Sequence, residues 1–186
     1  MKLYIVRHGQ TDWNSQHKVQ GKADISLNSK GIAQAEEIRK KLENELIDLI
    51  ICSPLKRAKE TAEVINRDRN IPIIYDEEIS ERDFGEFEGN NQKDFDFNGF
   101  WSYKQDQHYE SAENIKDFFY RIYTRLDKIK NDYKSKRILL VTHGGVSIAI
   151  ECYFNGIPNQ DSLLDLAVGN CEFKNYNIEK ENGVEI

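Results

Sequence analysis

Two histidines directly follow short apolar segments, and each stands beside a glycine. Residues 2–6 (KLYIV) lead into Arg7-His8-Gly9, and residues 137–142 (RILLVT) lead into His143-Gly144. A third apolar segment, residues 48–52 (DLIIC), is followed within a few residues by Arg57. Such apolar runs predict strands that are buried on both faces. If these strands are parallel, their carboxyl ends meet at one edge of the sheet, so two histidines and two arginines would converge there.

This combination of side chains suits a small multivalent anion, and phosphate in particular. The planar guanidinium groups of Arg7 and Arg57 can each bind two phosphate oxygens. The neutral imidazole of His8 can attack phosphorus through one ring nitrogen while the other donates to a carbonyl. His143 would then stabilise the transition state as a cation or as a hydrogen-bond donor. The residues therefore predict phosphoryl transfer to His8.

A leaving alkoxide also needs a proton, and residues 81–85 (ERDFG) supply carboxyl groups in a loop that contains a glycine. Like-charge repulsion from a bound phosphate favours the protonated carboxylic acid, which is the form that a general acid needs. Glu81 is the first candidate for this role. Asp83 competes with it on sequence grounds alone.

The segments between the predicted strands have helical spacing, which predicts an α/β fold of three layers, α/β/α, with a mostly parallel sheet. Ser111 is the predicted N-cap of the longest helix. Gly169-Asn170 predicts a β-hairpin or an edge strand over residues 165–176. The apolar positions of the three predicted helices are Ile32, Ala35, Ile38, Leu42 and Leu46; Ala58, Thr61, Ala62 and Ile65 after Pro54; and Ile115, Phe118, Phe119, Ile122, Tyr123, Leu126 and Ile129.

Length and composition limit the possible classes of protein. A chain of 186 residues fits one domain, and its net charge of -6 disfavours binding to nucleic acid. No apolar run is long enough to span a membrane, so we expect a cytoplasmic enzyme with no membrane partner. The three cysteines lack the spacing of metal ligands and are expected to be buried, reduced thiols. The aromatic-rich stretch 90–110 is expected to be an insertion or lid over the active site, and the charged tail 179–186 is expected to fray.

These segments resemble the histidine phosphatase superfamily, which is also called the phosphoglycerate mutase-like family. The resemblance consists of four blocks in the family's order, and together they span residues 1 to about 170. The blocks are Arg7-His8-Gly9 with Thr11, Asn14, Gln20-Gly21, Asp24, Leu27 and Gly31; Ser53-Pro54-Leu55-Lys56-Arg57-Ala58 with Thr61-Ala62; Glu81 with Phe84-Gly85 and Glu88-Gly89; and Thr142-His143-Gly144-Gly145.

The resemblance implies a single domain over residues 1–186 in which His8 accepts the phosphoryl group and Glu81, rather than Asp83, serves as acid and then base. It implies that Arg7, Arg57 and His143 surround that group. It implies that the protein uses no metal and no other cofactor. It also implies that the partner is a small phosphomonoester. The residues that it places near phosphate or substrate are Thr11, Asn14, Gln20, Gly21 and Gly144.

The family contains both phosphatases and mutases, and two departures favour a phosphatase. Mutases carry paired arginines in the stretch that corresponds to residues 90–111, where this chain has only Lys93 and Lys104 as cations. Mutases also tend to have asparagine where this chain has Gly145. The chain is similar to the family's short members, which include broad-specificity phosphatases and α-ribazole phosphatases. A cofactor-dependent phosphoglycerate mutase and a non-catalytic phosphate-binding module are the alternatives.

Overall fold

The central element is a five-stranded sheet in the order β3-β2-β4-β1-β5. The computed structural model describes residues 1–178 of the chain. Neighbouring strands among β1, β2, β3 and β4 are parallel, whereas β5 pairs antiparallel with β1. The strands are β1 (Lys2–Arg7), β2 (Leu49–Cys52), β3 (Ile73–Tyr75), β4 (Arg137–Thr142) and β5 (Phe173–Asn177).

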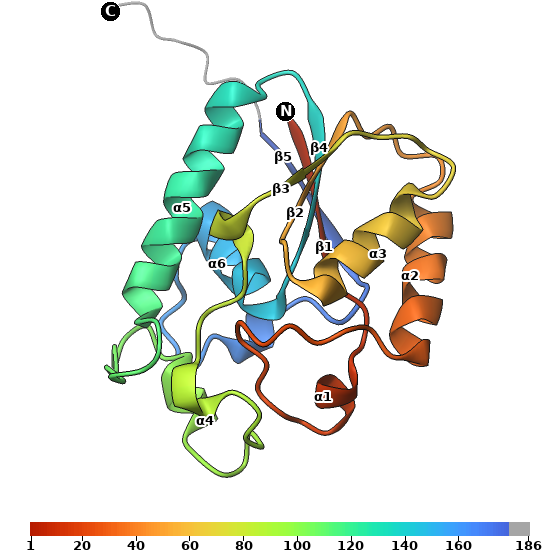
Figure 1. Ribbon diagram of the computed structural model, residues 1–186. Helices are drawn as coiled ribbons and strands as arrows, with labels where there is room; N and C mark the ends of the chain where they lie inside the picture. The colour runs from red at the N-terminus through yellow and green to blue at the C-terminus, as the bar shows by residue number, and fades with distance from the viewer. Residues whose placement is uncertain (179–186) are drawn as a thin grey trace, which may run out of the picture.

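Helices cover both faces of this sheet, so the fold has the three layers that the sequence predicts. Helices α2 and α3 lie on one face, and α5 and α6 lie on the other (Figure 1). The α-helices are α1 (Asp12–Ser15), α2 (Ser29–Lys41), α3 (Lys56–Asn66), α4 (Phe97–Phe100), α5 (Ile115–Asp132) and α6 (Gly144–Asn155), with 3₁₀ turns at Glu77–Ile79, Gly85–Phe87 and Leu164–Leu166.

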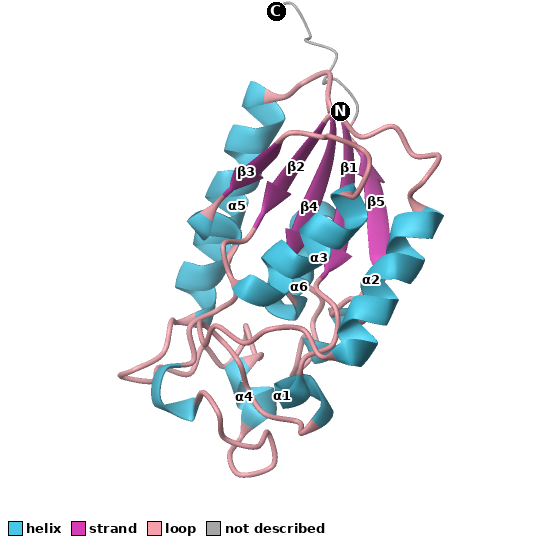
Figure 2. Cartoon of the chain, turned by 45° about the vertical axis from the view of Figure 1, so that its right-hand side comes forward, coloured by secondary structure: helices cyan, strands magenta, loops and turns pink. Residues whose placement is uncertain are grey.

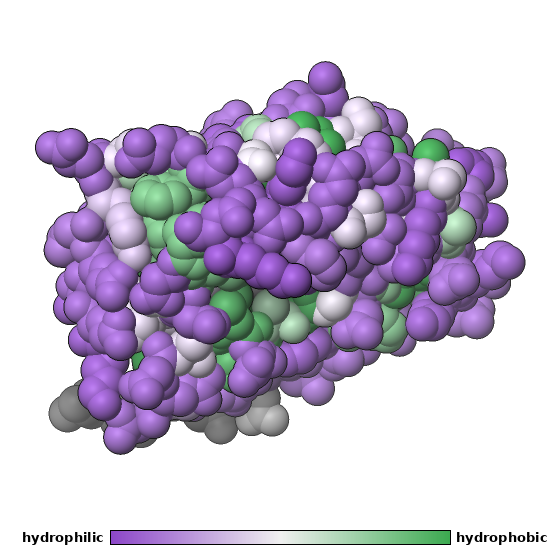
Figure 3. All heavy atoms as spheres, turned by 90° about the horizontal axis from the view of Figure 1, so that it is seen from below, coloured by the Kyte–Doolittle hydropathy of each residue, from purple (hydrophilic) through white to green (hydrophobic). Residues whose placement is uncertain are grey.

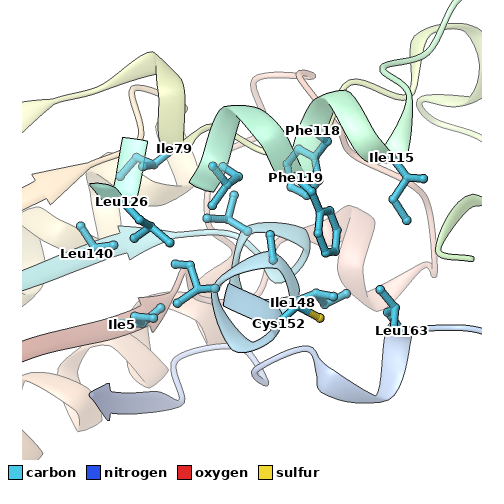
Figure 4. Close-up of a cluster of buried hydrophobic side chains, with 14 of the residues drawn as sticks. Ile5, Ile79, Ile115, Phe118, Phe119, Leu126, Leu140, Ile148, Cys152 and Leu163 are labelled. Carbon is cyan, nitrogen blue, oxygen red and sulfur yellow. The ribbon is translucent and has the colours of Figure 1, made fainter. Parts of the chain in front are cut away.

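The alternation of side chains along the strands builds a hydrophobic core on each side of the sheet. Leu3 and Ile5 of β1 join the core under α5 and α6, whereas Tyr4 and Val6 join the core under α2 and α3. Figure 4 shows part of the first core, including the α5 residue Phe118. Burial of each such side chain stabilises the fold by about 1.5–3 kcal/mol. Apolar runs without polar interruption are therefore what the central strands require.

Strands β1, β2 and β4 end at the same edge of the sheet, where α1, α4 and the longer loops gather (Figure 2). In the pairing of β1 with β4, Arg7 lies opposite Thr142. The residues that follow them, His8 and His143, are consequently neighbours. The parallel register thus positions two residues that are far apart in the sequence.

Most of the predicted elements are present, with shifted ends. Strand β4 has the predicted bounds, β1 is longer by Arg7, and β2 begins at Leu49 rather than at residue 48. The predicted face of α5 is buried except for the half-buried Tyr123. Ile32 and Leu46, which were expected to face the core, are exposed. Leu46 lies beyond the end of α2, so the helical spacing does not apply to it.

Two predicted details are wrong. The N-cap of α5 is Asn114, whose side chain accepts the N–H of Lys116 at 2.8 Å, and not Ser111. Residues 165–176 do not form a hairpin, because Leu164–Leu166 is a 3₁₀ turn and only β5 is extended there. The alternative of an edge strand is correct. The tail 179–186, which was expected to fray, lies outside the described residues.

Cys52, Cys152 and Cys171 are buried and free, as predicted. Within residues 1–178, no helix combines the length and the apolar character that a membrane crossing needs.

Candidate active site

The rings of His8 and His143 lie beside each other at the carboxyl ends of β1 and β4. Their centroids are 5.2 Å apart, and the ring planes are inclined at 60°. The backbone N–H of His8 donates to the carbonyl of Thr142 at 2.9 Å, which continues the ladder between the strands to this point. Both rings are almost fully buried. The strand pairing therefore fixes their separation.

The hydrogen bonds of His8 define its tautomer. Nδ1 lies 2.7 Å from the carbonyl oxygen of Gly9, which can only accept, so Nδ1 carries the proton. Nε2 then holds a lone pair, and Nε of Arg57 donates to it at 3.2 Å. Burial lowers the pKa of His8 well below 6.5, and the charges of Arg57 and Arg7 lower it further. The ring is consequently neutral, and its lone pair lies on Nε2, beside Arg57.

The guanidinium group of Arg57 is held by the main chain of the loop after α1. Its Nη1 donates to the carbonyl of Ala23 and its Nη2 to the carbonyl of Gly21, each at 2.7 Å. Burial lowers the pKa of Arg57 to about 10, so the group stays charged at neutral pH. This charge lies beside Nε2 of His8.

Glu88 holds that loop against the loop that carries Glu81. Its carboxylate accepts the N–H groups of Lys22 and Ala23 at 2.7 and 2.9 Å and that of Phe84 at 3.2 Å. A Cβ at Gly21 would collide with this carboxylate, and the φ of +53° at Gly21 also favours glycine. One side chain therefore fixes the relative positions of the two loops.

Arg7 and the start of α6 form another side of the site. Nη1 of Arg7 donates to the carbonyl of Val168 at 2.9 Å, whereas its buried Nε has no partner among residues 1–178. The Cβ of any residue other than glycine at 144 would lie 3.2 Å from Cζ of Arg7. The absence of a side chain at Gly144 thus lets the arginine and the helix start approach each other closely.

His143 is neutral, for the same reason as His8. Burial lowers its pKa well below 6.5, and the nearby Arg57 is the next cause. Its Nε2 lies 2.7 Å from Oγ of Ser53, and its Nδ1 has no partner in the described part of the chain. Of the two roles expected for His143, the neutral ring fits the hydrogen-bond donor better than the cation.

Glu81 lines the pocket beside these groups, whereas Asp83 does not. One oxygen of Glu81 accepts the N–H of Gly145 and the other accepts the N–H of Arg82, each at 3.0 Å. The carboxylate of Asp83 instead accepts the N–H of Gly85 at 2.8 Å within its own loop. Of the two acids that the spacing left open, only Glu81 is placed to reach a ligand.

Arg7, His8, Arg57 and Glu81 line the pocket, whereas the fully buried His143 is not among its lining residues. The predicted substrate-binding residues divide into those that line the pocket and one that does not. Asn14, Gln20, Gly21 and Gly144 line it. Thr11 is fully buried and does not: it caps α1 by accepting the N–H of Asn14, and its hydroxyl donates to Gln20. Thr11 therefore orients the loop.

An apolar lining makes up much of the rest of the pocket, and the sequence did not reveal it. We call it the apolar wall; its members are Val19, Phe84, Phe97, Trp101, Ile148, Leu164 and Ala167, and Lys18 and Gln92 are its polar neighbours. Figure 3 views the molecule from the end at which α1 and α4 lie, and it shows hydrophobic residues between hydrophilic ones. The pocket has a volume of about 290 Å³. It can accommodate a phosphate together with a small organic group.

Only part of the stretch 90–110 reaches the pocket. Gln92, Phe97 and Trp101 line it, whereas the ring of Tyr103 packs 5.1 Å from that of Phe119 in the core. The segment thus packs most of its aromatic residues against the body of the protein and presents a few to the pocket.

Arg82, which the sequence gave no reason to select, attaches this segment to the loop of Glu81. It is fully buried, and it donates to the carbonyls of Phe100 and Glu113. Its guanidinium group lies 5.4–5.6 Å from the ring centroids of Phe84, Phe100 and Trp101. The other two histidines of the chain, His17 and His108, are exposed and lie outside the pocket lining.

The carboxyl edge of a mostly parallel sheet thus brings together two neutral histidines, two arginines and a carboxylate. Residues 3–185 match the family model of the histidine phosphatase superfamily (branch 1). The chain belongs to this superfamily, and it is a phosphatase.

Relatives in sequence and in structure agree with this assignment. The chain is 36% identical over 184 residues to a Bacillus subtilis protein named uncharacterized phosphatase PhoE, covering 94% of this chain and 93% of that protein. YhfR of Bacillus stearothermophilus superposes with a TM-score of 0.86 at 29% identity, covering 96% and 91% of the two chains. The α-ribazole phosphatase of Shigella flexneri superposes with a TM-score of 0.83 at 28% identity, covering 97% and 92%.

Proposed function

We propose that the protein is a metal-independent phosphomonoesterase that hydrolyses a small phosphorylated metabolite through a phosphohistidine on His8. The observation that carries this proposal is the tautomer of His8, whose Nδ1 proton is engaged by Gly9 and whose Nε2 lone pair faces Arg57. A neutral imidazole fixed in this way is a ready nucleophile at neutral pH.

The first step forms a bond between Nε2 of His8 and phosphorus and breaks the bond between phosphorus and the ester oxygen. Glu81, in its protonated form, gives its proton to the leaving oxygen. In the second step Glu81 takes a proton from water, the water oxygen attacks phosphorus, and the bond to Nε2 breaks. Inorganic phosphate leaves, and both residues return to their initial states.

The other residues of the pocket neutralise and orient the phosphoryl oxygens. Arg7 and Arg57 supply the positive charge, and their guanidinium groups are already held by backbone carbonyls. His143 supplies a hydrogen-bond donor, and the N–H of Gly144 at the start of α6 can supply another. Phosphoryl transfer depends mainly on such positioning and charge neutralisation.

The apolar wall supports a leaving group that is apolar or carries a ring, and it argues against the mutase alternative. A phosphoglycerate mutase must bind a substrate carboxylate, which requires cations near the leaving group. Lys93 and Lys104, the cations of the 90–111 stretch, are exposed and do not line the pocket. Lys18 is the lysine that lines it among the described residues. We therefore propose hydrolysis, with residues 92–101 contacting the organic part of the ester.

The test is release of phosphate from a panel of monoesters in the presence of a chelator, with His8→Ala as the control. The panel contains aryl phosphates, α-ribazole phosphate, sugar phosphates, phosphoserine and 3-phosphoglycerate. We expect release by the native chain alone, and an acid-labile phosphoenzyme that His8→Ala does not form. Interconversion of monophosphoglycerates would identify a mutase. Phosphate binding without any turnover would identify a binding module, and loss of the rate on chelation would contradict the metal-independent mechanism.

A further inference from the structure

Ser53 contacts the ring of His143, and the proposed mechanism assigns Ser53 no role. It directly follows β2, and its N–H donates to the carbonyl of Val141 at 3.0 Å, which anchors it to β4. The residue is fully buried, and its Oγ lies 2.7 Å from Nε2 of His143. Within residues 1–178, Ser53 is the one residue that forms a hydrogen bond with the ring of His143.

The distances around the hydroxyl of Ser53 indicate where its proton goes. Oγ can donate to Oγ of Ser80, but only at 3.5 Å, and it accepts the backbone N–H of Leu55 at 3.4 Å. Hydrogen bonds between a hydroxyl and a strong acceptor are shorter, typically about 2.7–2.9 Å. The nearest acceptor for the hydroxyl proton is therefore Nε2 of His143, at 2.7 Å. The proposed role of His143 as a donor to the phosphoryl group selects the same direction, because Nε2 already faces Ser53 and Nδ1 is the ring nitrogen left to donate. In this arrangement Ser53 donates and Nε2 of His143 accepts.

This direction of donation determines the protonation of the other ring nitrogen. A neutral imidazole carries one proton, so a ring that accepts at Nε2 must carry its proton on Nδ1. Nδ1 is buried without a partner among residues 1–178, the ring of His8 lies 5.2 Å away between centroids, and Arg57 and Arg7 are among the charges that act on the ring. In the proposed mechanism an N–H at this atom donates to a phosphoryl oxygen. The opposite tautomer would present a lone pair to that oxygen and repel it.

We propose that Ser53 is a positioning residue that donates to Nε2 of His143 and so keeps the ring in the Nδ1–H tautomer, which donates to the phosphoryl group. The consequence for catalysis rests on the proposed function, whereas the tautomer itself is a property of the protein without substrate. The hydroxyl of Ser53 acts on the reaction only through the ring of His143.

The first measurement is the histidine nitrogen spectrum of the full-length protein, with the signals of His143 assigned by comparison with His143→Asn. We expect the native ring to show a protonated Nδ1 and an unprotonated Nε2. In Ser53→Ala the ring should lose this preference. Ser80→Ala is the matched control, because Ser80 is equally buried but contacts Ser53 only at 3.5 Å. A protonated Nε2 in the native protein, or the same spectrum in Ser53→Ala, would overturn the proposal.

The second measurement is the rate of phosphoenzyme formation. A misplaced donor in a transition state costs on the order of 10- to 100-fold, so Ser53→Ala should lower kcat by this factor with little change in KM, whereas Ser80→Ala should stay near the native rate. Ser53→Cys preserves the volume of the side chain but donates weakly, and it should lose activity in the same way while remaining folded. Equal rates in all four proteins would refute the catalytic role. A phosphoenzyme that persists in His8→Ala would instead refute the proposed function and leave the spectrum as the test of Ser53.

Discussion

The backbone N–H of Gly145 donates to Oε2 of Glu81 at 3.0 Å, and the carboxylate occupies the space that a side chain at residue 145 would need. A Cβ at this position would lie against Oε1 of Glu81 and Cη2 of Trp101, closer than real Cβ atoms approach other atoms. Glycine at this position therefore allows the carboxylate and the apolar wall to meet at the first turn of α6.

Replacement of Gly145 by alanine should consequently displace Glu81. We expect Gly145→Ala to lower kcat/KM for alkyl phosphates by about 10- to 100-fold, because small displacements of a catalytic group have effects of this size. Gly169→Ala is a suitable control, since its Cβ would meet only the movable end of Glu172. Equal activity in the two variants would contradict this role of Gly145.

Removal of the acid should affect poor leaving groups most. Glu81→Gln keeps the shape of the side chain but cannot give a proton to the leaving oxygen, so alkyl phosphates should lose about 10²- to 10⁴-fold in kcat. Activated aryl phosphates should lose much less in the phosphorylation step. Rapid-quench measurement of that step for both ester classes checks this expectation. Equal losses for the two classes would exclude Glu81 as the acid.

The lowered pKa of His8 predicts how the rate depends on pH. In the proposed mechanism the neutral ring of His8 is the nucleophile. Because burial keeps its pKa well below 6.5, the rate of phosphoenzyme formation should not fall as the pH drops through 6.5. It should decline only when the pH approaches the lowered pKa. Single-turnover rates across this pH range, with an aryl ester that needs no acid, test the point. A decline with a midpoint at 6.5 would contradict it.

The same two histidines should make the folded state less stable in acid. The pKa values of His8 and His143 are lower in the folded state than in the unfolded state, so the unfolded chain takes up protons first as the pH falls below about 6.5. The free energy of unfolding should decrease by about 1.4 kcal/mol per pH unit for each ring until its folded-state pKa is reached. Urea denaturation between neutral and acid pH measures this slope, and His8→Gln should reduce it.

Arg82 should control the position of the wall. Arg82→Met removes the donors to the carbonyls of Phe100 and Glu113 and the cation from the aromatic rings, so the variant should lose about 2–4 kcal/mol of unfolding free energy. Arg121→Met is a suitable control. Arg121 donates a hydrogen bond to the side chain of the same Glu113 but does not contact the apolar wall. Where both fold, only the Arg82 variant should show a raised KM for aryl esters.

Phe97 and Phe95 provide a direct test of the wall. Phe97 lines the pocket. Phe95 belongs to the same segment but packs against Phe87 and does not line the pocket. Phe97→Ala should raise KM for aryl phosphates by about 10-fold, which corresponds to loss of part of one buried ring. Phe95→Ala should leave KM unchanged, and phosphate inhibition should be the same in both. An equal rise in KM in the two variants would refute the wall as the binding surface.

The parts of the fold that follow from local chemistry were predictable from the sequence. Uninterrupted apolar runs marked β1, β2 and β4, and the helical spacing of α5 marked its buried face. Strand β3 has three residues, two of them exposed, so it gives no comparable signal. Helix α6 is apolar almost all round, which conceals its period. Short or uniformly buried elements lack the contrast between faces on which such predictions depend.

The site shows the same division. His8 and Arg57 follow apolar runs in the sequence, so their placement at the sheet edge could be predicted. The apolar wall could not, because Val19, Phe97 and Ile148 come from three distant segments that only the fold brings together. Ser53 belongs to the second sequence block that resembles the family. Its hydrogen bond to His143 could not be predicted, because it depends on β2 and β4 being neighbours in the sheet.

The position of Trp101 in the apolar wall has a practical consequence. The chain contains two tryptophans, and the other, Trp13, lies in α1 at the same end of the molecule, beside Lys18 of the pocket. The indole emission of the whole protein therefore originates next to the site. Occupation of the pocket by an unlabelled ester or by inorganic phosphate can be followed through intrinsic fluorescence, and replacement of either tryptophan by phenylalanine would assign the signal to one side of the pocket.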